Sequence, residues 1–171
     1  MTAEILVLRF VHVVGAIFWV GAILMNSLFL FPTLAEIGPA AGPVMVGLQR
    51  RKMMTVLPIV AILTILAGAR LMSIAAAGSG GAYFQSRSGR TLAIGAAAGI
   101  ISFLIGMFVG RPSAMRAGQL GAAIARASEG ERAALAAELA AVNRRGKLAG
   151  QAVVVLLLVA AGAMAVARYV G

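Results

Sequence analysis

The chain contains no cysteine, only five acidic residues, one histidine and one tryptophan. Without cysteine it can form no disulfide, no thiolate metal site and no cysteine nucleophile. It also has no carboxylate pair, no nucleophile–base arrangement and no phosphate-binding loop of a known pattern. The sequence therefore argues against hydrolytic and phosphoryl-transfer chemistry, and it assigns no enzymatic activity.

Long apolar runs dominate what is present. Hydrophobic residues make up 61% of the 171 residues and charged residues only 12%. A helix needs about 20 apolar residues to cross a bilayer, and four runs approach or exceed that length: residues 4–31, 53–76, 91–110 and 147–169. Because a backbone inside lipid must satisfy its own hydrogen bonds, we expect an all-α, four-helix transmembrane bundle that forms a single domain over residues 1–171.

Basic residues gather at the ends of these predicted spans, mainly in residues 50–52 and 111–147. The net charge is +10. Basic residues at such positions attract anionic lipid headgroups and set the membrane topology, so the charge does not indicate binding of nucleic acid. The positive-inside rule predicts that both termini lie outside. We expect the membrane to be the bacterial inner (cytoplasmic) membrane, with the termini in the periplasm. The start, Met-Thr-Ala-Glu, lacks the basic region of a cleavable signal, so residues 4–31 should be a retained span.

The segment of about residues 112–146 is predicted to be a helical cytoplasmic loop between spans 3 and 4. Pro112 suits the first turn of one helix, and Ser128 with Glu131 has the capping-box pattern that begins another. The resulting hairpin is interpreted either as a charged linker or as a segment that lies on the membrane surface or binds a partner.

Glycine and proline give three further expectations. Span 3 contains Gly95–Gly99 and Gly106–Gly110 at four-residue spacing, a pattern that allows close packing of helices inside a bundle. Pro58 should kink span 2. The first loop, PTLAEIGPAAGP, has too many prolines and glycines to form a long helix.

Polar side chains of the first span share one helical face. Positions 9, 12, 16, 19, 23 and 26 lie on one side of a helix, so Arg9, His12, Trp19 and Asn26 form a stripe. Ionisable groups inside a bilayer are costly and normally face the bundle interior or a cavity. The stripe is therefore expected to face the other helices.

Other side chains are predicted at the depth of His12, which lies roughly 12 Å from the outer end of its span at about 1.5 Å per residue. Arg70 of span 2 falls at the same depth, Met72 and Met164 lie slightly shallower, and Arg168 closes that end. A basic cluster with few acidic neighbours indicates an anionic guest.

Haem b is the first candidate for this guest. His12 would be an axial ligand, Arg9 or Arg70 would contact the propionates, and Met72 or Met164 would be the second ligand. The inner wall of the predicted site would be Trp19 and Asn26. Copper(I) bound by His12 and methionine thioethers is the second candidate, and bacteriochlorophyll could also use a lone histidine. A zinc site of the usual kind needs more protein ligands.

Two simpler interpretations remain open. His12 can be a hydrogen-bonded interhelical residue without any ligand. Arg9 and Arg70 can extend their charged ends to the headgroups, and the methionines can fill irregular apolar space.

The first span also resembles a known group of membrane proteins. Arg9-Phe-Val-His12, Trp19-Val-Gly21 and Pro32 are similar to the first helix of the copper-resistance protein D-like superfamily, and a similar pattern occurs in membrane domains of the urate oxidase N-terminal type. Bacterial four-helix protoporphyrinogen oxidases likewise place a histidine early in their first span. The resemblance implies an integral membrane protein in which His12 carries haem or copper.

The resemblance is looser beyond the first span. Thr64, Gly68 and Arg70 resemble the end of the second helix in such proteins, and the segment from Met164 to Tyr169 resembles the C-terminus of four-helix members. The oxidases use a lysine further along the chain, whereas the lysines here, Lys52 and Lys147, both lie at the predicted cytoplasmic boundary.

The leading hypothesis is therefore a small inner-membrane protein with a haem or copper site in the outer half of its bundle and a redox or metal-handling role. The rival hypothesis is a non-catalytic subunit or assembly factor of a larger respiratory or photosynthetic membrane complex, with His12 as an interhelical residue or a pigment ligand. The expected partners are the lipid bilayer and either a larger complex or further copies of the chain. A transporter is a weaker third hypothesis, because no broken-helix pair or inverted repeat is present.

Overall fold

The computed structural model describes residues 2–170, and within this range it contains helices joined by short turns and no strand. Four stretches are long and apolar enough to cross a membrane: Ala3–Glu36, Met53–Gly78, Arg87–Ile124 and Glu129–Tyr169. The predicted all-α class and the four apolar helices are thus confirmed. Large apolar side chains on their outer faces, such as Phe10 and Ile17 at 67% and 70% exposure, are those of a multi-pass membrane protein.

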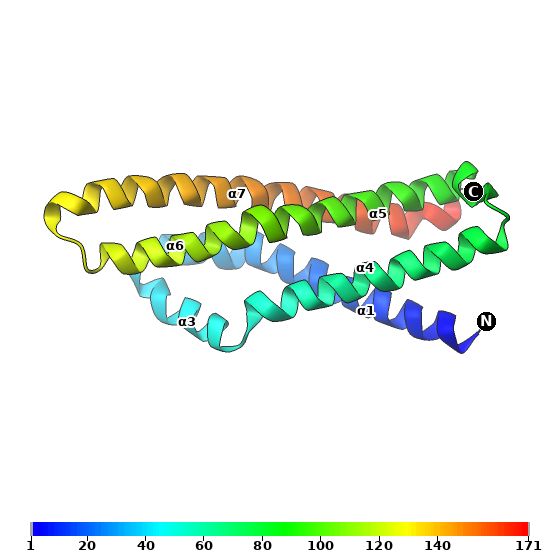
Figure 1. The fold of residues 1–171 in the computed structure, drawn as a ribbon, viewed down its shortest axis with the longest axis horizontal. Coiled ribbons are helices and arrows are strands. Elements are labelled where there is room, and N and C mark those ends of the chain that lie inside the picture. Colours follow the sequence, from blue (N-terminus) through cyan, green and yellow to red (C-terminus); the bar gives the residue numbers. More distant parts are fainter. Residues whose placement is uncertain (1, 171) are drawn as a thin grey trace.

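The N-terminal half of the chain holds the first two of these stretches. Its elements are α1 (Ala3–Met25), the π-helical segment η1 (Asn26–Leu30), α2 (Phe31–Glu36), the 3₁₀ turn η2 (Gly38–Ala41), α3 (Gly42–Arg50) and α4 (Met53–Gly78). The first residues of the predicted first loop, up to Glu36, continue the first long helix, and the loop then proceeds through η2 into α3. The chain bends between α3 and α4 (Figure 1) at Lys52, whose φ of 56° lies in the left-handed region.

The C-terminal half holds the other two. Its elements are the 3₁₀ turn η3 (Ala82–Gln85), α5 (Arg87–Ile105), the π-helical segment η4 (Gly106–Gly110), α6 (Arg111–Ile124), α7 (Glu129–Val166) and the 3₁₀ turn η5 (Ala167–Tyr169). The capping box at Ser128 and Glu131 is present, as predicted, at the start of α7.

The 112–146 segment is helical, with Pro112 in the first turn of α6, and no turn separates it from the spans on either side. α5, η4 and α6 follow one another without a turn, and α7 is a single helix of 38 residues. At about 1.5 Å per residue such a helix is ~57 Å long, much longer than the ~30 Å hydrocarbon layer. The segment is therefore a continuation of the last two membrane helices rather than a pair of independent helices.

A π-helical turn precedes a proline in both interrupted helices. The N–H of Phe31 donates to the carbonyl of Asn26, and the N–H of Arg111 donates to that of Gly106, each across five residues. Proline at the following position lacks an N–H and crowds the carbonyl four residues earlier. A local π adjustment accommodates this defect, so the helices continue through Pro32 and Pro112 instead of ending there.

The four long helices form two pairs that meet at one central layer. α1 packs mainly on α4, and α5 packs mainly on α7; α1 begins and α7 ends at the same end of the molecule, opposite the tip of the α6–α7 hairpin (Figure 1). The central layer has four buried residues, Trp19, Ala61, Val153 and Leu157. Partly buried side chains, among them Phe103 of α5, pack against them, so all four helices take part.

Glycines of α5 and of η4 have different roles. A β-carbon on Gly95 would lie 3.1 Å from the β-carbon of Ala163 and 3.2 Å from the carbonyl oxygen of Ala160, so this glycine permits the close approach of α5 and α7. A β-carbon on Gly106 would meet nothing within 4 Å. The first small-residue pattern of span 3 thus serves packing inside the bundle, as predicted, and the second coincides with η4.

Candidate functional site

His12 lies at the seam between α1 and α4, where it contacts the backbone of the opposite helix. Its Nδ1 is 2.8 Å from the carbonyl oxygen of Thr64. A carbonyl only accepts hydrogen bonds, so Nδ1 carries the proton and donates. This tautomer leaves a lone pair on Nε2 as long as the ring is neutral.

Two glycines create the space for this contact. A β-carbon on Gly68 would lie 2.6 Å from Cε1 and 2.8 Å from Nδ1 of His12, so the imidazole rests directly on the backbone of α4. One turn further along the seam, a β-carbon on Gly15 would collide with the hydroxyl of Thr64. That hydroxyl donates to the carbonyl of Val60 in its own helix at 2.8 Å, which fixes the side chain against α1.

The stripe on α1 faces the bundle over most of its length. Asn26 and Trp19 are buried, at 8% and 7% exposure, and His12 is half-buried. Arg9, at the outer end of the stripe, is exposed. The expectation that the stripe faces the other helices therefore holds from Asn26 to His12 and fails at Arg9, whose side chain is exposed.

The inner members of the stripe are held by packing and by a weak polar contact. Trp19 meets Phe103 of α5 edge to face, with 6.4 Å between ring centroids and 79° between the ring planes. Asn26 donates from Nδ2 to the thioether sulfur of Met53 at 3.9 Å. About two helical turns, or roughly 10 Å, separate Trp19 from His12.

Two of the arginines predicted near His12 already have partners. Both Nε and Nη2 of Arg70 lie 2.8 Å from Oε1 of Glu4, with both side chains about half exposed. Arg168 donates to the hydroxyl of Tyr169 and stacks 4.5 Å from the centre of its ring. The sequence indicated a basic cluster with few acidic neighbours at this end, and one such neighbour, Glu4, extends from the first turn of α1 to pair with Arg70.

The two candidate methionines lie in different helix pairs. Met72 follows Gly68 by one turn on the same face of α4 and is half-buried. Met164 is on α7, where its Cγ would lie 3.6 Å from a β-carbon on Gly95. It thus packs in the α5–α7 pair, whereas His12 belongs to the α1–α4 pair.

These positions can be compared with the needs of a haem or copper site. A ligating histidine typically donates from its other nitrogen to a carbonyl or carboxylate, which fixes its tautomer and orientation, and His12 meets this requirement through Thr64. Arg9 makes no ion pair with any other described residue and is available to an anionic group. A propionate would have to compete with Glu4 for Arg70.

Within the described residues, no group of three or more His, Asp or Glu side chains could hold a metal ion. A copper ion would therefore need methionine ligands, and Met72 lies on the same face of α4 as the seam. Of the two candidate methionines, Met72 thus belongs to the same helix pair as His12, and Met164 does not.

Sequence reasoning did not assign the seam to Thr64, Gly68 and Gly15. The hydrogen-bond acceptor at Thr64 is its backbone carbonyl, which every residue type has, so the sequence cannot indicate it. A signal was present in the four-residue spacing of Thr64 and Gly68, because small residues at this spacing let helices approach. Phe103, the partner of Trp19, had no comparable signal.

Comparisons of this chain with protein-family models, with curated proteins and with solved structures give no match. Any functional conclusion therefore depends on the site itself.

Proposed function

We propose that this protein is a small inner-membrane protein that binds a metal-containing cofactor at His12, in the outer half of the bundle, with a redox or metal-handling role. Haem is the first choice and copper the second. The proposal places both termini in the periplasm and the α6–α7 hairpin in the cytoplasm, because the basic residues concentrate at the hairpin end.

The observation that carries the proposal is the hydrogen bond from His12 Nδ1 to the carbonyl of Thr64 at 2.8 Å. This bond orients the imidazole, and it directs any ligation to Nε2. The resemblance of Arg9–Pro32 to the copper-resistance protein D-like superfamily agrees with this role for His12.

In this proposal, haem would supply one-electron chemistry at its iron. His12 would hold the metal from one side, and Gly68 would keep the ring flat against α4. Arg9 would bind a carboxylate at the membrane boundary through its charged guanidinium. Trp19 would close the site towards the centre of the bundle.

The test is the visible absorption spectrum of detergent-purified protein, expressed with ample haem, in oxidised and dithionite-reduced form. Two variants distinguish the role of His12 as a metal ligand from its structural role in the hydrogen bond to Thr64. His12→Ala removes both nitrogens, whereas His12→Asn keeps a side-chain N–H that can donate to Thr64 but removes Nε2.

We expect a Soret band in the wild type and its loss in both variants, with His12→Asn retaining the helical content and thermal stability of the wild type. A Soret band that persists in folded His12→Asn would overturn His12 as the ligand. A colourless wild-type protein would overturn haem, and copper content measured on the same three proteins would then decide the second choice.

A second candidate function is a subunit or assembly factor of a larger membrane complex. It is favoured by the length of the α6–α7 hairpin, which continues both membrane helices well past the bilayer. In that case the bond between His12 and Thr64 would only join α1 to α4. A stoichiometric partner that co-purifies in mild detergent with a colourless protein would favour this candidate over the first.

A further inference from the structure

A groove of about 770 Å³ runs between η4 and α7, near the point where both helices leave the predicted bilayer. Ile105 and Val109 form one side, and Ala141, Arg144, Arg145 and Leu148 line the other. Because the residues on α7 follow one another at helical spacing, the two arginines lie one turn, or about 6 Å, from Leu148 along the helix axis. Along α7 the two arginines thus lie between Ala141 on the hairpin side and the apolar Leu148 on the membrane side.

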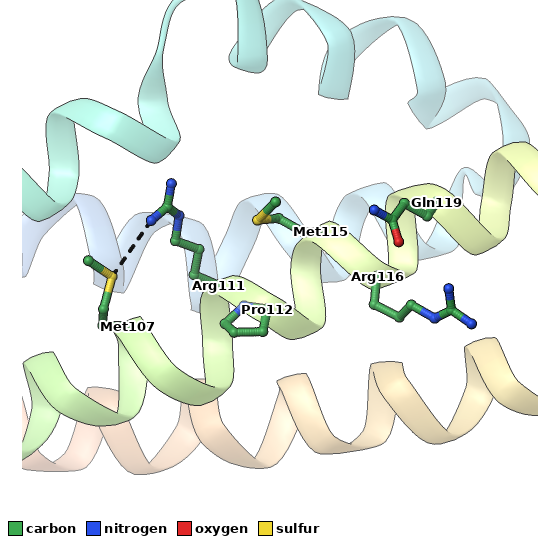
Figure 2. Close-up of a pocket in the computed structure, with 6 residues that line it drawn as sticks. All are labelled: Met107, Arg111, Pro112, Met115, Arg116 and Gln119. Carbon is green, nitrogen blue, oxygen red and sulfur yellow. Dashed lines mark hydrogen bonds between the residues drawn. The ribbon is translucent and has the colours of Figure 1, made fainter.

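The neighbouring groove contains an arginine whose charge is already paired. The second groove, of about 420 Å³, lies along η4 and α6 and includes Met107, Arg111 and Arg116 (Figure 2). Arg116 points away from Arg111, and its guanidinium pairs with Glu138 of α7 at 2.6 Å. The charge of Arg116 is therefore already compensated.

Arg144 and Arg145 are exposed and make no ion pair with another described residue. The chain carries a net charge of +10, so few acidic side chains are available to neutralise these two arginines. Two uncompensated guanidiniums beside an apolar channel fit a ligand that has an anionic group at one end and a hydrocarbon chain at the other.

We propose that this groove binds an anionic phospholipid. The headgroup phosphate would accept hydrogen bonds from Arg144 and Arg145, and one acyl chain would lie along Ile105, Val109 and Leu148. The π-helical turn of η4 places Val109 on the wall of the groove, and the half-buried Val109 leaves apolar surface for the chain. This site is independent of the proposed cofactor at His12, which lies in the other half of the bundle.

The test is native mass spectrometry of the detergent-solubilised protein titrated with phosphatidylglycerol, with zwitterionic phosphatidylcholine of the same acyl chains as the neutral lipid. We expect phosphatidylglycerol adducts at lower lipid concentration than phosphatidylcholine adducts. Arg144→Gln/Arg145→Gln should weaken phosphatidylglycerol binding roughly 30-fold, which corresponds to about 1 kcal/mol for each arginine near an anionic surface.

Two controls distinguish lipid binding in the groove from a general effect of charge and from an effect on folding. Arg87→Gln/Arg90→Gln removes the same charge at the opposite end of the molecule and should leave the affinity within about twofold of the wild type, because these charges lie beyond the screening distance. Ala141→Trp fills the groove without changing charge and should also weaken binding, whereas Ala136→Trp, an exposed position of α7 outside the groove lining, should not.

The proposal is overturned if both lipids bind alike to the wild type, or if the two double variants lose affinity equally. Calorimetry with inorganic phosphate distinguishes a lipid site from a simple phosphate site. Phosphate binding that depends on Arg144 and Arg145, without a preference for the anionic lipid, would also overturn it.

Discussion

The imidazole of His12 lies directly against the backbone of Gly68, with the ring positioned where any side chain on α4 would collide with it. The contact joins the first two membrane helices of the chain. It also holds His12 in the orientation that lets Nδ1 reach Thr64 at 2.8 Å.

Gly68→Ala should therefore displace His12 and weaken the α1–α4 pair. We expect a loss of about 1–3 kcal/mol, as for other overpacked interiors, measured as the free energy of unfolding in mixed detergent micelles. Gly21→Ala is the matched control, because a β-carbon there would meet nothing within 4 Å and the gain in helix propensity is the same. Equal stability of the two variants would contradict the contact.

A second prediction concerns Gly15 and Thr64, which touch across the same seam. Gly15→Ala alone should be destabilising, because its β-carbon would collide with the Thr64 hydroxyl. Adding Thr64→Ala removes that hydroxyl and should recover much of the loss. In a double-mutant cycle we expect a favourable coupling of about 0.5–3 kcal/mol, and additive effects of the two substitutions would show that the residues do not touch.

Trp19 provides the third prediction, because it links the two helix pairs through Phe103. Trp19→Ala should cost about 3 kcal/mol, the lower end of the range for large aromatic residues in protein cores. The comparison is with Phe18→Ala, whose side chain is 50% exposed and should change stability by less than about 1 kcal/mol. Unfolding followed by tertiary probes would measure both, and a larger effect of Phe18→Ala would contradict the central layer.

The sequence predicted the helical architecture because that signal is local. Apolar length alone identifies the four membrane helices, and the capping box at Ser128 and Glu131 lies within four residues. The continuity of α5 into α6 was missed, because Pro112 normally marks a helix start. The sequence does not show that η4 shifts the hydrogen bonds and so accommodates the proline.

The candidate site was predictable only in part, for a related reason. The periodicity of α1 placed His12, Trp19 and Asn26 on an inward face. It could not place Arg70 against Glu4, since 66 residues separate them and the ion pair depends on the register of α1 with α4. The periodicity also could not indicate that the backbone carbonyl of Thr64 accepts a hydrogen bond from His12.

The fourth prediction concerns pH and the start of α7. Hydrogen bonds from the side chain and the backbone N–H of Ser128 lower the pKa of Glu131 below its ordinary value of 4.5. A carboxyl group whose pKa is lowered by folding stabilises the folded form above the ordinary pKa, and this contribution is lost as the pH falls through the lowered value.

Amide protection factors near residues 129–135, measured by hydrogen exchange, should therefore fall between pH 6 and pH 3, with both values chosen around the ordinary pKa of 4.5. Glu131→Gln should show weaker protection at pH 6 and little further change on acidification. A protection factor in the wild type that is independent of pH would contradict the role of this hydrogen-bonded pair.

The separation of the bundle into two helix pairs also affects how the protein is made. His12, Thr64 and Gly68 all belong to α1 and α4, so every contact of the seam lies within the first 78 residues of the chain. During synthesis, these two helices emerge from the ribosome and enter the membrane before α5 and α7 are translated. The seam can therefore assemble as an early co-translational hairpin, to which the later helices add through contacts that include the layer around Trp19.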